Sequence, residues 1–255
     1  MEIPLAQIVS VFLVIATRMS GIMLFAPFFG DAAIPVRIKA ALTLLFTVLL
    51  YPTYSAQIAA FRPEQWPLLI GREVIIGIAL GITATLGFEA AEMAGSVLGV
   101  QMGYSLVNIL DPHTQVETTV MSAFHRTMAM LIFLALDVHH WILRAVARSF
   151  DYLPPGTSAI NGSFVAMLIG SAGTILKLGL QIAAPVLGAT IAADLVLGAL
   201  SKASPQLPIL LLGPAIKGLL GVILLSAVVR YWPDLFHRIF SECFSFTETV
   251  LRLAW

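Results

Sequence analysis

Residues 77–112 are the most informative part of this sequence and read GIALGITATLGFEAAEMAGSVLGVQMGYSLVNILDP. Small residues recur in it at intervals of four, at Gly87, Ala91, Gly95, Gly99 and Gly103. Because residues four apart share one face of an α-helix, this face carries almost no side chains over about five turns. We expect a second helix to pack closely against it, either from the same chain or from another subunit.

The composition of the whole chain indicates a membrane protein. Of the 255 residues, 59% are hydrophobic and 11% are charged, and the mean hydropathy is +0.95. Soluble domains contain only roughly 45–50% apolar residues. At about 20 residues per span, the chain has room for at most about eight transmembrane helices. We therefore predict an all-α, polytopic helical membrane protein with long kinked hairpin helices and no soluble domain of its own.

Charge and cysteine content exclude several other classes of protein. Fourteen Lys and Arg balance fourteen Asp and Glu, so no basic field exists that would attract nucleic acid. The one cysteine, Cys243, cannot form a disulfide within the chain or a cysteine-rich metal cluster. No GxxxxGK[ST] phosphate-binding loop occurs. We expect no cofactor and no enzyme active site.

Proline, glycine and polar clusters divide the apolar sequence into segments. We expect helices over about 4–28, 35–54, 68–110, 114–150, 162–201 and 209–229. The start of the chain carries Glu2 and no Lys or Arg, and no small-residue cleavage site follows the first apolar stretch, so we interpret 4–28 as a retained helix. The segment 68–110 is too long for one ordinary span, so we expect a bend or a re-entrant turn in it. Pro185 should kink the helix that contains it, because proline lacks the amide proton.

The carboxyl-terminal tail has the pattern of an amphipathic helix. Apolar or weakly polar residues recur at helical spacing, at Phe236, Ile239, Phe240, Cys243, Phe244, Thr247, Val250 and Leu251. This pattern is typical of a helix that lies at the bilayer interface, where Trp232 and Trp255 would anchor it. Docking of the same face onto a partner is the alternative.

Charged residues interrupt most of the apolar segments. They are Arg18, Glu89, Glu92, Lys177, Asp194, Lys202 and Lys217. A charge that faced lipid at mid-depth would cost roughly 2.5–3.5 kcal/mol, so these side chains should face protein or water. Pairing within the chain or across subunits would compensate them. Asp194 and Lys202 are eight residues apart, beyond the one-turn spacing of helical ion pairs, so each needs a separate partner.

Two further features of the sequence are a pair of adjacent histidines and a polar stretch after the glycine face. His139 and His140 are adjacent, which directs their side chains about 100° apart on a helix, so we expect no metal site there. The glycine face ends in Gln101 and Tyr104, followed by Asn108 and the helix-breaking pair Asp111-Pro112. Irregular polar backbone at membrane depth occurs only where protein buries it or water lines it.

Taken together, these segments resemble the FliR family, whose members are integral-membrane components of the flagellar type III export gate. The residues that carry the resemblance are Gly95, Gly99, Gln101, Met102, Gly103, Tyr104, Ser105, Asp111, Pro112, Phe133, Leu134, Ala135, Leu136, His139, His140, Ser149, Phe150, Leu153, Pro154, Gly156, Asp194, Leu197, Gly198, Lys202, Pro205 and Gln206. They cover nearly the whole chain in order. The virulence injectisome proteins are the nearest competing group, although the His-His pair and the Leu-Pro-x-Gly turn are more similar to the flagellar branch.

The resemblance implies a role, partners and a location. One copy of the chain would join several FliP-like and FliQ-like subunits in a helical gate in the bacterial inner membrane, contacted by an FlhB-like subunit. Unfolded flagellar proteins would pass through its pore. The resemblance also implies a FliP-like part at about 1–155 and a FliQ-like part at about 156–255. The segment expected to help close the pore comprises Gln101, Met102, Gly103, Tyr104, Ser105, Asn108, Asp111 and Pro112.

Two other classes of function predict patterns that differ from those of this sequence. A small secondary transporter predicts corresponding broken helices in two halves of the chain, and the glycine repeat before residue 103 has no counterpart after residue 160. An intramembrane enzyme needs a nucleophile with a base, or a pair of acids, in one site. No spacing in the sequence indicates such a set.

Overall fold

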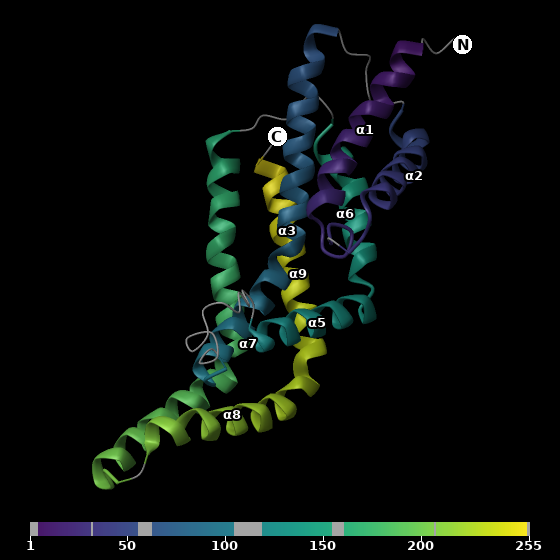
Figure 1. Ribbon diagram of the computed structural model, residues 1–255. Coiled ribbons are helices and arrows are strands. Elements are labelled where there is room, and N and C mark those ends of the chain that lie inside the picture. The colour runs from purple at the N-terminus through teal and green to yellow at the C-terminus, as the bar shows by residue number, and fades with distance from the viewer. Residues whose placement is uncertain are drawn as a thin grey trace. The chain divides into compact units, whose positions relative to one another are not determined.

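The computed structural model describes residues 5–31, 33–55, 63–104, 119–154, 161–206 and 208–253. Within these ranges the regular elements are all helices, which confirms the all-α prediction (Figure 1). They are α1 (Leu5–Phe25), α2 (Val36–Tyr54), η1 (Pro63–Gln65), α3 (Trp66–Gln101), α5 (Val120–Ala135), α6 (Val138–Tyr152), α7 (Gly162–Ala203), α8 (Ile209–Val228), η2 (Val229–Tyr231) and α9 (Trp232–Leu253).

The length and composition of these helices confirm a polytopic membrane protein. Five helical segments of the described chain are long and apolar enough to cross a membrane, and α5 with α6 would make a sixth if the pair counts as one bent span. The helices α3 and α7 have 36 and 42 residues. At 1.5 Å per residue, both exceed the roughly 30 Å of a bilayer core.

The predicted helix boundaries hold except in two places. The stretch predicted as one helix over 114–150 is broken after Ala135, where α5 ends, and α6 begins at Val138. Asp137 at this break has a positive φ of 54°, a backbone conformation that an α-helix cannot contain. The second place is the end of the segment 68–110, because α3 ends at Gln101; the bend or re-entrant turn expected in this segment stays a prediction.

The chain forms two compact units that interleave along the sequence. The first contains Met1–Leu86, Asp137–Ala172 and Phe240–Trp255, and the second contains Gly87–Leu136 and Gly173–Ile239. This division follows contacts between helices. The division at about residue 155 follows from family likeness, and it stays a prediction.

In the first unit, α1 and α3 approach so closely that their backbones touch. A Cβ atom added at Gly21 would lie 2.9 Å from the Cα of Gly77, and one added at Gly81 would lie 2.6 Å from the Cβ of Phe25. A real Cβ cannot occupy either place without displacing backbone or side chain. The glycines therefore permit this helix crossing, as small residues do at membrane helix interfaces.

The same unit is fastened by Arg18, which is completely buried. Its Nε donates to Glu73 Oε2 at 2.7 Å, and its other nitrogens donate to Ser149 Oγ at 3.1 Å and to the Leu153 carbonyl at 3.0 Å. The guanidinium also lies 4.1 Å from the centre of the Phe150 ring. This one side chain therefore joins α1, α3 and α6, and it satisfies the expectation that a charge in an apolar helix finds a partner.

The tail helix α9 confirms the predicted amphipathic pattern but not the predicted environments. Its apolar face is buried by the chain itself, at Trp232, Phe236, Ile239, Phe240, Cys243, Thr247, Val250 and Leu251. Trp232 is 1% exposed, so it cannot anchor the helix in the headgroup region. Trp255 lies outside the described residues. The face that was predicted to meet lipid or a partner is therefore part of the protein core.

Candidate functional site at the end of α3

The helix α3 ends in a regular capping turn. The amide of Tyr104 donates to the carbonyl of Gly99 at 2.9 Å, and the amide of Gly103 donates to that of Val100 at 3.1 Å. Gly103 has a φ of +86°. This is the Schellman arrangement, which favours glycine because other residues rarely adopt a left-handed backbone. Gly103 therefore caps the helix and does not continue the glycine face that was predicted to include it.

Three helices of the second unit meet beside this cap through polar side chains. Gln101 Nε2 of α3 donates to Asp194 Oδ2 of α7 at 2.6 Å. Lys217 Nζ of α8 lies 2.9 Å from Asp194 Oδ1. The Asp194 carboxylate thus uses both oxygens and links α3, α7 and α8. We call Gln101, Asp194 and Lys217 the polar node.

An apolar contact fixes the cap on its other side. Met102 is 1% exposed, and a Cβ added at Gly221 of α8 would lie 2.6 Å from its sulfur. A Cβ added at Gly103 would lie 2.7 Å from the Cβ of Pro214. The end of α3 is therefore held on α8 by close packing as well as by the polar node.

The next described helix, α5, also starts against the end of α3. Thr119 caps α5, because its Oγ1 accepts a hydrogen bond from the Ser122 amide at 3.1 Å. A Cβ added at Gly99 would lie 2.7 Å from Thr119 Oγ1, and one added at Gly95 would lie 2.6 Å from the Cα of Ser122. Gly99 therefore contacts both Tyr104 and Thr119. Its carbonyl accepts a hydrogen bond from the Tyr104 amide, and the Thr119 side chain packs against it.

The structure thus places the predicted site residues in two groups. Gln101, Met102, Gly103 and Tyr104 lie together at the capped end of α3. Ser105, Asn108, Asp111 and Pro112 lie outside the described residues. On the predicted packing face, Gly95 and Gly99 meet α5 of the same chain, and Gly87 and Ala91 are buried.

Comparison with known proteins identifies the family. Residues 9–243 match the model of the family described as bacterial export proteins, family 1. The chain belongs to bacterial export family 1. The FliR flagellar biosynthetic protein of Pectobacterium carotovorum is 30% identical over 234 residues, which cover 92% of this chain and 90% of that protein. The FliR protein of Bacillus subtilis is 27% identical over 95% of both chains.

A relative from a secretion system matches as well. The secretion system apparatus protein SsaT of Salmonella typhimurium is 28% identical over 177 residues, which cover 69% of this chain and 68% of that protein. The names of these relatives denote flagellar biosynthesis and secretion, and none denotes an enzyme. Membership of the export family agrees with the predicted resemblance and removes the secondary transporter as an alternative.

The charges that interrupt the apolar segments differ widely in burial in this export-family chain. Arg18 is buried and Glu92 and Lys217 are partly buried, whereas Glu89, Lys177, Asp194 and Lys202 are exposed in the single chain. Four of the seven therefore have access to water or to other subunits, because a chain of this length has little interior. Their burial in an assembly stays a prediction.

Sequence reasoning missed two of the charged partners. Glu73 pairs with Arg18, and Arg126 of α5 pairs with Glu92 of α3 at 2.6 Å. Glu73 follows Arg72 near the start of α3, so it had the appearance of a polar residue at a helix end. Its position 55 residues from Arg18 gives no periodic signal. Only the crossing of α1 over α3 brings the two together.

Proposed function

We propose that this chain is the FliR-type core subunit of a type III protein export gate in the bacterial inner membrane. The observation that carries the proposal is the family match over residues 9–243, supported by FliR relatives that align over about nine-tenths of both chains. The five membrane-length helices of the described chain agree with a membrane location.

The proposed partners are FliP-like, FliQ-like and FlhB-like subunits, with unfolded flagellar proteins as cargo. Support comes from apolar side chains that the chain leaves uncovered on α2, α7 and α8, among them Leu44, Leu45, Val48, Leu49, Ile169, Leu195, Val196, Leu219 and Ile223. Lys177, Asp194 and Lys202 are exposed on α7. Because exposed charges are costly in lipid, this mixed surface favours protein neighbours over a fully lipid-facing helix.

We further propose that the segment from Gln101 to about Glu117 helps to close the pore. An idle gate must hold back ions and still admit an unfolded chain, so its seal should be a loop on a rigid base. The polar node and the Met102 contact supply such a base at the start of the segment. Just beyond the segment, Thr119 packs against Gly99 of α3.

Deletion of Asn108 to Pro112 tests the closing role. The shortened protein should assemble but leak, so cells that express it should become sensitive to detergent and high salt. The purified gate should conduct ions in planar bilayers. A control that replaces the same five positions with a Gly-Ser sequence of equal length separates the effect of length from that of side chains. A shortened gate that assembles, stays ion-tight and still secretes would limit this segment to a connecting role.

The subunit assignment has its own test. The chain, expressed in a bacterium that lacks its FliR protein, should restore swimming and should co-purify with FliP-like and FliQ-like proteins in mild detergent. The second candidate is the equivalent subunit of a virulence injectisome, which the SsaT relative favours. Restoration of injectisome secretion without restoration of swimming would select that candidate. Failure of both, with the protein present in the membrane, would contradict the export-gate proposal.

A further inference from the structure

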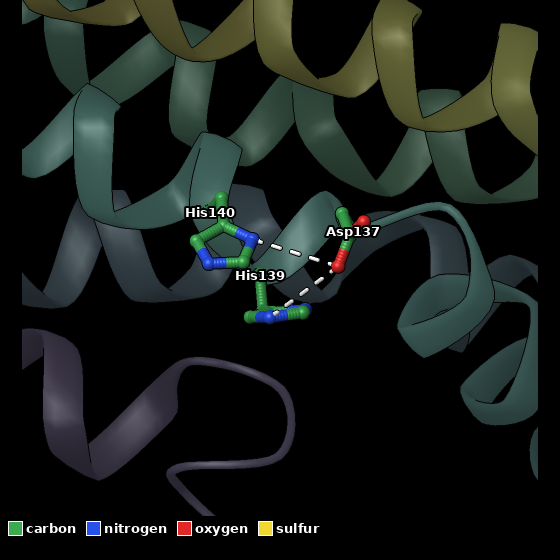
Figure 2. A group of neighbouring side chains, drawn as sticks. All are labelled: Asp137, His139 and His140. Atoms are coloured by element: carbon green, nitrogen blue, oxygen red, sulfur yellow. Dashed lines mark ion pairs between the residues drawn. The ribbon is translucent and has the colours of Figure 1, made fainter.

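A cluster of metal-binding side chains lies at the first turn of α6. It consists of Asp137, His139 and His140 (Figure 2). Asp137 is the residue that precedes α6, and its φ of 54° is one of two positive values at non-glycine residues in the described chain. A left-handed backbone costs a residue other than glycine about 1 kcal/mol or more. Such a position is a reason to look for a function.

The Asp137 carboxylate is not used to cap the helix. Aspartate in this position normally accepts a hydrogen bond from an amide of the first turn, but Asp137 makes no such side-chain bond. Its Oδ1 instead lies 3.6 Å from His140 Nδ1 and 3.8 Å from His139 Nε2. Both distances exceed that of a good hydrogen bond, so the carboxylate approaches the two rings at the distance of loose ion pairs.

The two histidines converge, contrary to the expectation from their adjacent positions. Their ring centres are 4.1 Å apart with an interplanar angle of 38°. A separation of 100° along the helix directs the Cβ atoms apart, but rotation of the side chains brings the rings over the helix end. One donor atom from each of the three residues lies within 4.8 Å of the others. Adjacent positions on the helix therefore do not by themselves keep the donor atoms apart.

These distances are those of loose ion pairs, and they are also close to the spacing of ligand atoms around one metal ion. Zinc binds histidine nitrogen and carboxylate oxygen at about 2.0–2.2 Å in a tetrahedron, which separates neighbouring donor atoms by roughly 3.3–3.5 Å. The two distances to the Asp137 oxygen are within about half an ångström of that range. The donor atoms of the three residues all lie within 4.8 Å of one another, so coordination of one ion requires them to move closer together.

We infer that Asp137, His139 and His140 form a three-ligand site for a divalent transition-metal ion of the zinc class. Ions of this class bind imidazole nitrogen together with carboxylate oxygen. Mg²⁺ and Ca²⁺ instead favour oxygen ligands alone. The side chains of Asp137 and His140 are 72% and 56% exposed, so an ion can enter from solvent. Its fourth position would hold water or a ligand from a neighbouring subunit.

Zinc binding by the intact protein tests the inference. The full chain is purified in detergent with an affinity tag that contains no histidine and is treated with a chelator. It is then titrated with Zn²⁺ in competition with a zinc-sensitive dye. We expect one Zn²⁺ per chain. His139→Ala, His140→Ala and Asp137→Asn should each weaken binding about tenfold or more, since even the residues behind metal ligands contribute that much.

A matched control uses His237→Ala, which removes an exposed histidine of α9 outside the cluster and should leave binding unchanged. Cobalt gives an independent signal, because Co²⁺ in a tetrahedral site absorbs strongly in the visible range, and this absorption should disappear in His140→Ala. Unchanged thermal unfolding of each variant would show that it folds. The absence of stoichiometric Zn²⁺ binding, or equal binding by the control and the cluster variants, would overturn the proposal.

Discussion

Replacing Arg18 by Met is expected to strand a buried carboxylate in the first unit. Arg18 and Glu73 are both 0% exposed and lie 2.7 Å apart. Removing one partner of such a pair costs about 3–5 kcal/mol, because the remaining charge loses its compensation while it stays out of water. Arg18 also donates to Ser149 and to the Leu153 carbonyl, which places the expected loss in the upper part of this range.

A more exposed Arg–Glu pair provides a control of nearly equal length. Arg126 and Glu92 lie 2.6 Å apart, but their side chains are 52% and 26% exposed. Exposed pairs contribute about 0–1 kcal/mol. Arg18→Met should therefore be several times more damaging than Arg126→Met. The two distances are nearly equal, so the comparison contrasts a buried, multiply bonded arginine with an exposed one.

The assay uses the single cysteine. Cys243 is 4% exposed and belongs to the same unit as Arg18, so a thiol-reactive dye labels it only when that unit opens on heating. For a chain of this size, about 1 kcal/mol corresponds to roughly 2–4 °C. Arg18→Met should lower the midpoint by about 6–20 °C, and Arg126→Met by no more than about 4 °C.

A double substitution separates the charge from the packing. Arg18→Met with Glu73→Met removes both charges, and an apolar replacement of a buried pair is often neutral or stabilising. The double variant should therefore recover much of the stability lost by either single variant. Single variants at Arg18 and Glu73 that unfold no earlier than Arg126→Met would refute the reasoning, because they would show that the pair is not buried in the protein.

Three further predictions concern packing, function and a single hydrogen bond. Gly95→Leu should prevent accumulation of the folded protein, because a Cβ there meets the backbone of α5. The control Gly71→Leu should be tolerated, because no atom lies within 4 Å of a Cβ at that position. Normal yield of both variants would exclude close packing at Gly95. Asp194→Ala should reduce motility more than Arg252→Ala does, because it releases the polar node, and equal swimming halos would contradict this. Tyr54→Phe removes a hydroxyl that donates to a backbone carbonyl at 2.7 Å and should cost about 0.5–1.5 kcal/mol, measured by the same cysteine labelling; an unchanged midpoint would show that the bond contributes nothing.

Helix type and most helix ends could be predicted from the sequence because both depend on local signals. The polar clusters before α2 and after α7 contain Pro35 and Pro205, and the helices begin and end next to them. The break at Asp137 has no proline or glycine near it. A left-handed backbone at an aspartate leaves no mark in the pattern of apolar residues, so the predicted helix ran through it.

The surfaces of the helices were easier to predict than the partners of those surfaces. The spacing of residues in α9 predicted its buried apolar face, and two residues of the predicted glycine face, Gly95 and Gly99, lie against the start of α5. Periodicity shows that a face must be covered, but the covering element is set by tertiary packing. For Gly95 it is α5, and for the apolar face of α9 it is the chain itself.

The polar node shows why isolated charges in apolar helices are informative even when their partners cannot be read from the sequence. Gln101, Asp194 and Lys217 were each selected because they are polar within an apolar segment, and the folded chain brings all three together. An unpaired charge in such a segment is costly, which leaves few acceptable places for it. Two charges of opposite sign on neighbouring helices therefore favour one another. The same cost would oppose separation of α3 from α7 and α8.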